Sequence, residues 1–278
     1  MRISPSITQV IAKVVLFMAT ASAVCALIFV VGFVLAGGFS HLSWKFLTEP
    51  ILDMGRSGGI LPAIVGTLFM VFVAIGIAAP LGIASSIYLA EYTEEGRVTQ
   101  AIRFGINCLA GVPSIIFGLF GFILFVVILG FGWSILSGGL SLSAMILPTI
   151  IRTSEEALRS VPMPYRDVAA SLGATRWQVV TRSVLPYALP GILTGVILGI
   201  GRSIEETAVV IFTAGSAVQM PTSLFDSART MAVHFYILAR EGISNDNAYA
   251  TASVLICTIL VINIVAYTTM HRMMRGRR

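Results

Sequence analysis

The stretch 152–185, RTSEEALRSVPMPYRDVAASLGATRWQVVTRSVL, decides how the rest of this chain is arranged. It is rich in arginine and acidic residues, and it follows a stretch without any charged residue, 104–151. A second charge-free stretch, 183–201, starts at its end. Because a membrane-spanning helix needs about 20 apolar residues, we predict that 152–185 is a polar loop between two membrane spans.

The local sequence predicts short helices within this loop. Ser154, followed by two glutamates, is typical of a helix start, and the prolines in 162–164 end that helix. We predict a second helix over 165–172, which Gly173 can end in a left-handed conformation. Thr175 can then cap a third helix.

The composition of the whole chain agrees with a membrane protein. Of its 278 residues, 56% are hydrophobic and 11% are charged, against about 25% charged residues in soluble domains. The mean hydropathy is +0.92. The stretch 104–151 would be about 70 Å long as one helix, so we divide it at its glycine-rich centre. We predict an all-α integral membrane protein with six spans, at roughly 10–37, 60–89, 105–129, 139–152, 185–216 and 248–270.

Arginine and lysine are distributed unevenly between the predicted loops. Under the positive-inside rule, most of them are cytoplasmic if both termini are cytoplasmic. The residues left outside are then Lys45, Arg56, Arg229 and Arg240. The first span could instead be a cleaved signal peptide, but its apolar core exceeds the 7–15 residues of such segments. We expect it to be retained, and we divide the chain into an N-terminal helix with an outer loop, 1–56, and a five-helix core, 57–278.

The helix predicted over 165–172 has two physical interpretations. Ala169 and Ala170 are small, so another protein could approach the helix closely and hold it in a cleft. The helix could equally lie on the lipid surface, with its arginines facing headgroups. The residues alone leave both interpretations open.

Residues in and after this helix resemble the EAA motif of ABC importer permeases. The motif reads Glu-Ala-Ala, three residues, Gly, nine residues, Ile, any residue, Leu-Pro. Here Asp167, Val168 and Ser183 replace its Glu, first Ala and Ile, whereas the spacing is intact. The resemblance implies the transmembrane domain of a type I (MetI-like) ABC importer, with a coupling helix that docks on an ATPase subunit. The coupling residues that it implies are Asp167, Ala169, Ala170, Gly173, Leu185 and Pro186.

Catalytic and cofactor chemistry is not indicated by this sequence. No Gly-Lys-Ser or Gly-Lys-Thr occurs, so we expect ATP to be bound and hydrolysed by a partner subunit. Three scattered histidines and three cysteines without ligand spacing predict no metal site. The net charge of +5 comes from residues that border the spans, and it does not indicate nucleic-acid binding. We predict a permease subunit that is not itself an enzyme and that has no cofactor.

Three charged residues fall within the fifth predicted span, namely Arg202, Glu205 and Glu206. Each charge at such a depth costs roughly 2.5–3.5 kcal/mol, and on one helix both carboxylates could reach the guanidinium. Arg202 could meet an anion in a translocation path, because its planar fork matches phosphate oxygens. The alternative is an internal ion pair that only holds the helices together. The net charge of −1 would repel an anion unless one glutamate is protonated or faces away.

Longer segments narrow the resemblance to one group of permeases. They are GILPAIVGTLFMV, SSIYLAEYTEEGR, LAGVPSIIFGLFG, GRSIEETAVVIFTAG and TSLFDSARTMAVHFYILAREG, which are spread over 57–242. They resemble the PstA family of phosphate permeases, whose usual Gly-Glu-Thr-Ala differs here at Glu205. The resemblance implies import of inorganic phosphate with a second homologous permease, ATPase subunits and an extracytoplasmic phosphate-binding protein that could touch 217–247.

Other functions remain open at this point. A permease of the same architecture could carry another oxyanion, such as molybdate, sulfate or phosphonate. An ion-coupled secondary transporter or a membrane-embedded enzyme belongs to a different class. The EAA-like loop argues against a secondary transporter, and the sequence shows no cluster of catalytic or metal-binding groups that an enzyme would need. We expect polar residues of the outer loop, such as Arg229 and His234, to be ordinary solvated or interfacial polar groups.

Overall fold

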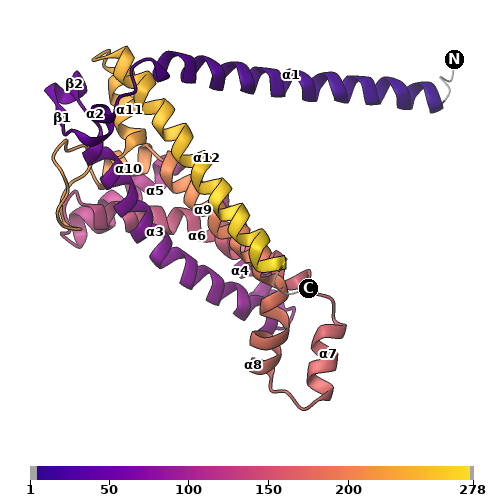
Figure 1. The fold of residues 1–278 in the computed structure, drawn as a ribbon. Helices are drawn as coiled ribbons and strands as arrows, with labels where there is room; N and C mark the ends of the chain where they lie inside the picture. The colour runs from indigo at the N-terminus through magenta and orange to yellow at the C-terminus, as the bar shows by residue number, and fades with distance from the viewer. Residues whose placement is uncertain (1–4, 276–278) are drawn as a thin grey trace.

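The structure, a computed structural model, describes residues 5–275 as a bundle of helices with one short hairpin (Figure 1). The hairpin pairs β1 (Ile51–Leu52) with β2 (Ser57–Gly58) in antiparallel orientation. The helices are α1 (Pro5–Phe39), α2 (Trp44–Thr48), α3 (Leu61–Ile87), α4 (Arg97–Ala110), α5 (Ser114–Gly121), α6 (Ile135–Arg159), α7 (Pro164–Ser171), α8 (Arg176–Val179), α9 (Leu185–Glu205), α10 (Ala208–Thr213), α11 (Met231–Arg240) and α12 (Asn245–Arg275). Three π-helical turns extend them, η2 (Tyr88–Tyr92), η3 (Phe122–Ile128) and η4 (Val180–Val184), and a 3-10 turn, η1 (Asp53–Gly55), closes the hairpin.

The predicted six spans agree with the structure if one of them is a broken span. Five helical segments of the described chain are long and apolar enough to cross a membrane, and there are six if one bent pair counts as a single span. That pair is α4 with α5 and η3, which meet at an angle of 98°. A single helix over 105–129 was therefore a wrong prediction. Pro113 precedes α5 in an extended conformation, and a proline disfavours helical geometry in the residue before it.

Helix α6 is longer than the predicted span 139–152. It continues without interruption to Arg159, so the helix start that we predicted at Ser154 is wrong. No glycine or proline separates 152 from 159, and the helix ends only shortly before Pro162. The two glutamates after Ser154 thus belong to the last turns of a membrane helix.

The fifth predicted span, 185–216, is also divided. Helix α9 ends at Glu205, Glu206 has an extended backbone (φ −71°, ψ 127°), and α10 begins at Ala208. The three charged residues of this region therefore lie at the end of a helix and at its break, and not in the middle of one helix.

Helices α3, α6 and α9 pack closely together at the centre of the bundle. The largest buried cluster contains Met70 and Val73 of α3, Ile146 and Ile150 of α6, and Val209 of α10. Helices α6 and α9 can approach closely because Gly195 of α9 has no side chain. A Cβ at this position would collide with Thr153 on α6. Gly195 thus serves packing within this chain.

The elements separate into two ends (Figure 1). The C-terminal part of α3 lies at one end together with α4, α7, α8 and the C-terminus. The hairpin, α2 and α11 lie at the other end. Helix α1 projects from the bundle, and its last turns contact α12, where Ser253 donates a hydrogen bond of 3.2 Å to the carbonyl oxygen of Val34.

Candidate functional site

Helix α7 is the predicted second helix of the loop, and its boundaries are set by local sequence. Pro164 occupies its first turn, where a missing N–H costs nothing. At its other end the N–H of Gly173 donates to Ala170 (2.9 Å) and the N–H of Ala174 donates to Ala169 (3.2 Å). These two bonds form a Schellman motif, which requires a left-handed residue. Gly173 supplies it with φ +78°, as predicted.

Helix α8 begins with the predicted cap. The side chain of Thr175 accepts from the N–H of Gln178, and the side chain of Gln178 accepts from the N–H of Thr175 (2.9 Å). This reciprocal capping box satisfies two backbone donors at once. The turn between α7 and α8 is thus fixed from both sides.

The base of α7 rests on a small apolar core beneath the loop. That core contains Leu158, Val161 and Val184, and both Ala169 and Leu185 pack against it. Ser183, which departs from the EAA motif, donates a hydrogen bond of 2.8 Å to the carbonyl oxygen of Tyr165. This hydrogen bond therefore links the start of α7 to η4.

The face of α7 that carries Val168 is apolar and open. Val168 is 63% exposed and Leu172 is 83% exposed. A groove of about 380 Å³ runs along the helix, lined by Pro164, Tyr165, Val168, Ala169, Leu172 and Ser183. Of the predicted coupling residues, Asp167, Ala170 and Gly173 are exposed, whereas Ala169, Leu185 and Pro186 are half-buried.

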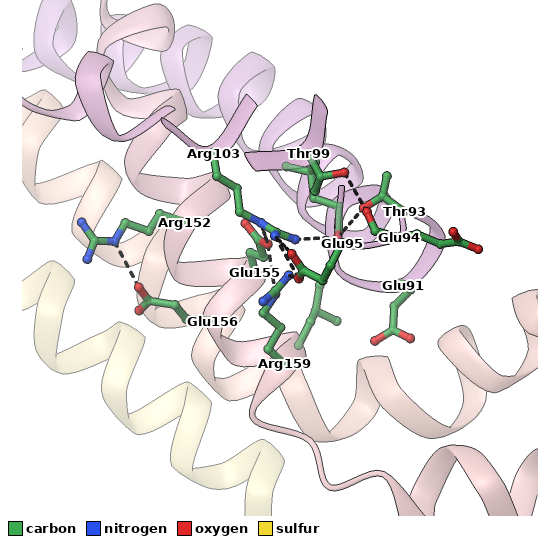
Figure 2. A network of polar contacts seen from close by, with 12 residues as sticks. Glu91, Thr93, Glu94, Glu95, Thr99, Arg103, Arg152, Glu155, Glu156 and Arg159 are labelled. Atoms are coloured by element: carbon green, nitrogen blue, oxygen red, sulfur yellow. Dashed lines mark hydrogen bonds and ion pairs between the residues drawn. The ribbon is translucent and has the colours of Figure 1, made fainter. Parts of the chain in front are cut away.

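An ion-pair network joins three elements near the same end of the bundle (Figure 2). Arg103 of α4 donates to Glu95 (2.8 Å) and to Glu155 of α6 (2.7 Å). Arg159 of α6 also contacts Glu95 (2.6 Å). The hydrogen bond from Arg159, and to a lesser extent that from Arg103, holds the pKa of Glu95 below its usual value. Glu95 is therefore ionised at neutral pH. The network fastens the loop after α3 and α4 to the last turns of α6.

The break between α9 and α10 carries the three predicted path residues. Arg202 is half-buried and Glu205 is exposed. Glu206 accepts from the N–H of Val209 (3.3 Å), so its carboxylate satisfies a donor in the first turn of α10. Within residues 5–275, no ion pair joins Arg202 to either glutamate. The expected contact of both carboxylates with Arg202 is absent there, and Glu206 lies beyond the end of α9.

The comparison with protein families is decisive for classification. The family described as "Binding-protein-dependent transport system inner membrane component" matches residues 78–278, which is more than half of the chain.

The chain belongs to this family of transport permeases.

Several named relatives align with most of this permease. The Bacillus subtilis "Probable ABC transporter permease protein YqgI" is 33% identical over 250 residues, covering 84% of this chain and 85% of the relative. The Mycobacterium tuberculosis (strain H37Rv) "Phosphate transport system permease protein PstA 1" is 33% identical over 238 residues, covering 84% and 76%. The Mycobacterium leprae PstA protein is 36% identical over 208 residues, covering 73% and 68%.

Solved structures confirm the predicted fold class. The inward-facing MetNI methionine ABC transporter matches with a TM-score of 0.64 at 20% identity, covering 77% of this chain and 95% of that one. A bacterial alginate ABC transporter in complex with its periplasmic protein matches with a TM-score of 0.68 at 17% identity, covering 94% of both chains. This permease is therefore a multi-pass inner-membrane component with the transmembrane fold of type I importers, and it is not an enzyme.

The permease also contains a buried polar cluster that sequence reasoning missed. Arg229 is 2% exposed and His234 is 1% exposed, although we predicted solvated or interfacial groups at both positions. Arg229 donates to the carbonyl oxygen of Ser216 (3.1 Å), and its Nη1 lies 3.3 Å from Nδ1 of His234. Because a guanidinium can only donate, Nδ1 is the acceptor and the neutral ring carries its proton on Nε2. Only tertiary packing shows that these side chains are enclosed.

This cluster makes the stability of the permease depend on pH. Burial, and then the nearby Arg229, lower the pKa of His234 from 6.5 to about 4. Between these values the unfolded chain binds a proton that the folded chain does not. We therefore expect the contribution of His234 to stability to be complete above about pH 6.5 and to fall by about 3 kcal/mol as the pH drops to about 4.

We expect the His234→Gln variant to remove this dependence, since glutamine can accept from Arg229 without titrating. The measurement is thermal unfolding of the purified permease, followed by tryptophan fluorescence, at about pH 7 and about pH 4.5. The drop in melting temperature should be roughly 5–10 °C larger for wild type than for the variant. An equal drop in both proteins would show that His234 does not titrate in this range.

Proposed function

We propose that this permease imports inorganic phosphate as the membrane subunit of an ATP-driven transporter. The observation that supports phosphate as the substrate is the similarity to proteins named PstA, at 33–36% identity over 73–84% of this chain. The matched family supports the dependence on a binding protein, which the proposal takes to be an extracytoplasmic phosphate-binding protein.

The surface of α7 supports an ATPase as the cytoplasmic partner. A short helix with a rigid turn, an open apolar face and a groove suits docking between protein surfaces. In this proposal Asp167, Ala170 and Gly173 face the ATPase, whereas Ala169, Leu185 and Pro186 hold the helix at its angle. ATP is bound by that partner.

The break between α9 and α10 supports a path for an anion. Arg202 keeps a positive charge that no carboxylate of the described chain neutralises by an ion pair. Because Glu206 is engaged with the backbone of α10, it is held back from the guanidinium. We propose Arg202 as the phosphate contact, with Glu205 and Glu206 at the edge of the path.

The arrangement of the two ends supports the proposed orientation. Loop 152–185 and the start of α4 lie at one end with the C-terminus (Figure 1), and Arg97, Arg103, Arg159, Arg166 and Arg176 belong to these segments. We propose that this end and both termini are cytoplasmic. A second homologous permease completes the path, and the division into 1–56 and the core 57–278 is part of the same proposal.

Uptake of radiolabelled phosphate into proteoliposomes tests this function. The vesicles contain the permease, its partner permease and the ATPase, with binding protein outside and ATP inside or withheld. We expect uptake that requires ATP and that an excess of molybdate or sulfate does not reduce. ATP-driven flux of molybdate or sulfate but not of phosphate would replace the substrate. Uptake without ATP would contradict the ATP-driven mechanism and favour a secondary transporter.

A further inference from the structure

Arg166 is an arginine of α7 that faces the membrane bundle and not the exposed groove. Its Nη2 lies 2.6 Å from Oε1 of Glu91, and its Nε lies 3.2 Å from Oε2. The same guanidinium donates to the carbonyl oxygens of Val161 (2.7 Å) and Leu158 (3.0 Å). The side chain of Arg166 is 17% exposed, and that of Glu91 is 8% exposed. A bidentate, largely buried pair of this kind fixes both distance and angle between its two elements.

Glu91 lies on η2, the π-helical turn that continues α3. Two further contacts hold this turn. The guanidinium of Arg176 at the start of α8 lies 5.4 Å from the ring centre of Tyr92, and Arg103 of α4 donates to the carbonyl oxygen of Leu89 (3.2 Å). The turn therefore receives a contact from each helix of the loop, α7 and α8, and one from α4.

The other end of α3 contacts the buried Arg229 region. The side chain of Thr67 accepts a hydrogen bond of 2.9 Å from the N–H of Met231, the first residue of α11. A Cβ at Gly66 would lie 2.8 Å from the carbonyl oxygen of Arg229, so the backbones touch there. One helix thus connects the loop at one end of the bundle with α11 at the other.

We propose that the Glu91–Arg166 ion pair transmits the movement of α7 to α3, and so couples ATP hydrolysis by the docked subunit to opening of the path. This inference rests on the proposed docking of α7. Arg166 and Glu91 are positioning residues here, since neither contacts the substrate. A rigid pair between two elements moves them together, whereas separate contacts would let α7 rock on the loop core while α3 stayed in place.

The exposed pair Arg152–Glu156 offers a matched control. It is also an arginine–glutamate pair (3.0 Å), but both partners are on α6 and their side chains are 59% and 64% exposed. Breaking it removes an ion pair of the same chemistry without separating two elements. The comparison is therefore between Glu91→Gln and Glu156→Gln, each in the complete transporter.

The experiment measures three quantities in proteoliposomes, which are ATPase retained on the permease, ATP hydrolysed and phosphate imported. For Glu91→Gln we expect a retained ATPase that hydrolyses ATP, with about tenfold less phosphate imported per ATP, as is usual for loss of a coupling free energy. Glu156→Gln should match wild type in all three. An unchanged ratio of phosphate to ATP in Glu91→Gln would overturn the inference.

Folding effects are separated by a second variant, Glu91→Asp, which keeps the charge and shortens its reach. Reduced coupling with retained ATPase in this variant supports the inference. Loss of the ATPase from both variants would overturn it in favour of a role in folding alone. Failure of the proposed function appears separately, because it would be seen as a wild-type permease that retains no ATPase or imports phosphate without ATP.

Discussion

The Arg202→Ala permease is expected to assemble with its partners and to import phosphate at least about 30-fold more slowly than wild type. Removing one partner of a largely desolvated charge contact costs about 2–5 kcal/mol, and about 1.4 kcal/mol corresponds to a factor of ten. Assembly should survive, because Arg202 forms no ion pair with the described residues of its own chain. Initial rates of phosphate uptake and the amount of ATPase retained are the measurements.

Two further variants test whether the effect depends on the planar guanidinium and on this position. Arg202→Lys keeps the charge without the planar fork, so we expect an intermediate rate. Arg97→Ala removes an exposed arginine at the start of α4 and should import phosphate as wild type does. If Arg202→Ala transports at the wild-type rate, the break between α9 and α10 is not the phosphate path, and Arg202 has a different role.

The Gly173→Val permease is expected to lose about nine-tenths of its bound ATPase. Gly173 has φ +78°, a conformation that costs other residues about 1–2 kcal/mol and β-branched residues more. No neighbouring atom lies within 4 Å of a Cβ built there, so the penalty comes from the backbone and not from a collision. Valine should release the Schellman turn and change the angle between α7 and α8. Co-purification of the ATPase with a tagged permease measures the loss.

Gly173→Asn is the matched control for this experiment. Asparagine tolerates the left-handed conformation, so it adds a side chain of similar size while the turn is kept. We expect it to retain most of the ATPase. Equal retention by the valine and asparagine variants at the wild-type level would count against α7 as the docking element. Equal loss would mean that any side chain at Gly173 obstructs the contact.

The parts of this fold that depend on neighbouring residues were predictable from sequence. Helix α7, the left-handed Gly173 and the Thr175 cap each follow from residues within one turn, because capping and turn chemistry act locally. The number of spans followed from charge-free stretches. The glutamates after Ser154 were misassigned, since acidic residues also occur in the last turns of a helix when arginines pair with them.

The breaks within spans and the buried polar groups were not predictable in the same way. Hydropathy does not distinguish a straight helix from the bent pair α4–α5, and it does not show that the helix stops between Glu205 and Glu206. Arg166 and Glu91 are 75 residues apart in sequence, so nothing local indicates their contact. The enclosure of Arg229 and His234 likewise depends on residues far away, including the carbonyl of Met54.

The double-capped turn between α7 and α8 has a thermodynamic consequence for assembly. Ordering a backbone residue costs about 1–2 kcal/mol of conformational entropy, and a segment that folds only on binding loses that amount from its affinity. The Schellman motif and the capping box order this turn before any partner arrives. The free energy of the contact is then not reduced by the cost of ordering the turn, so the affinity is higher. Association should be limited by diffusion and orientation and not by folding of the loop.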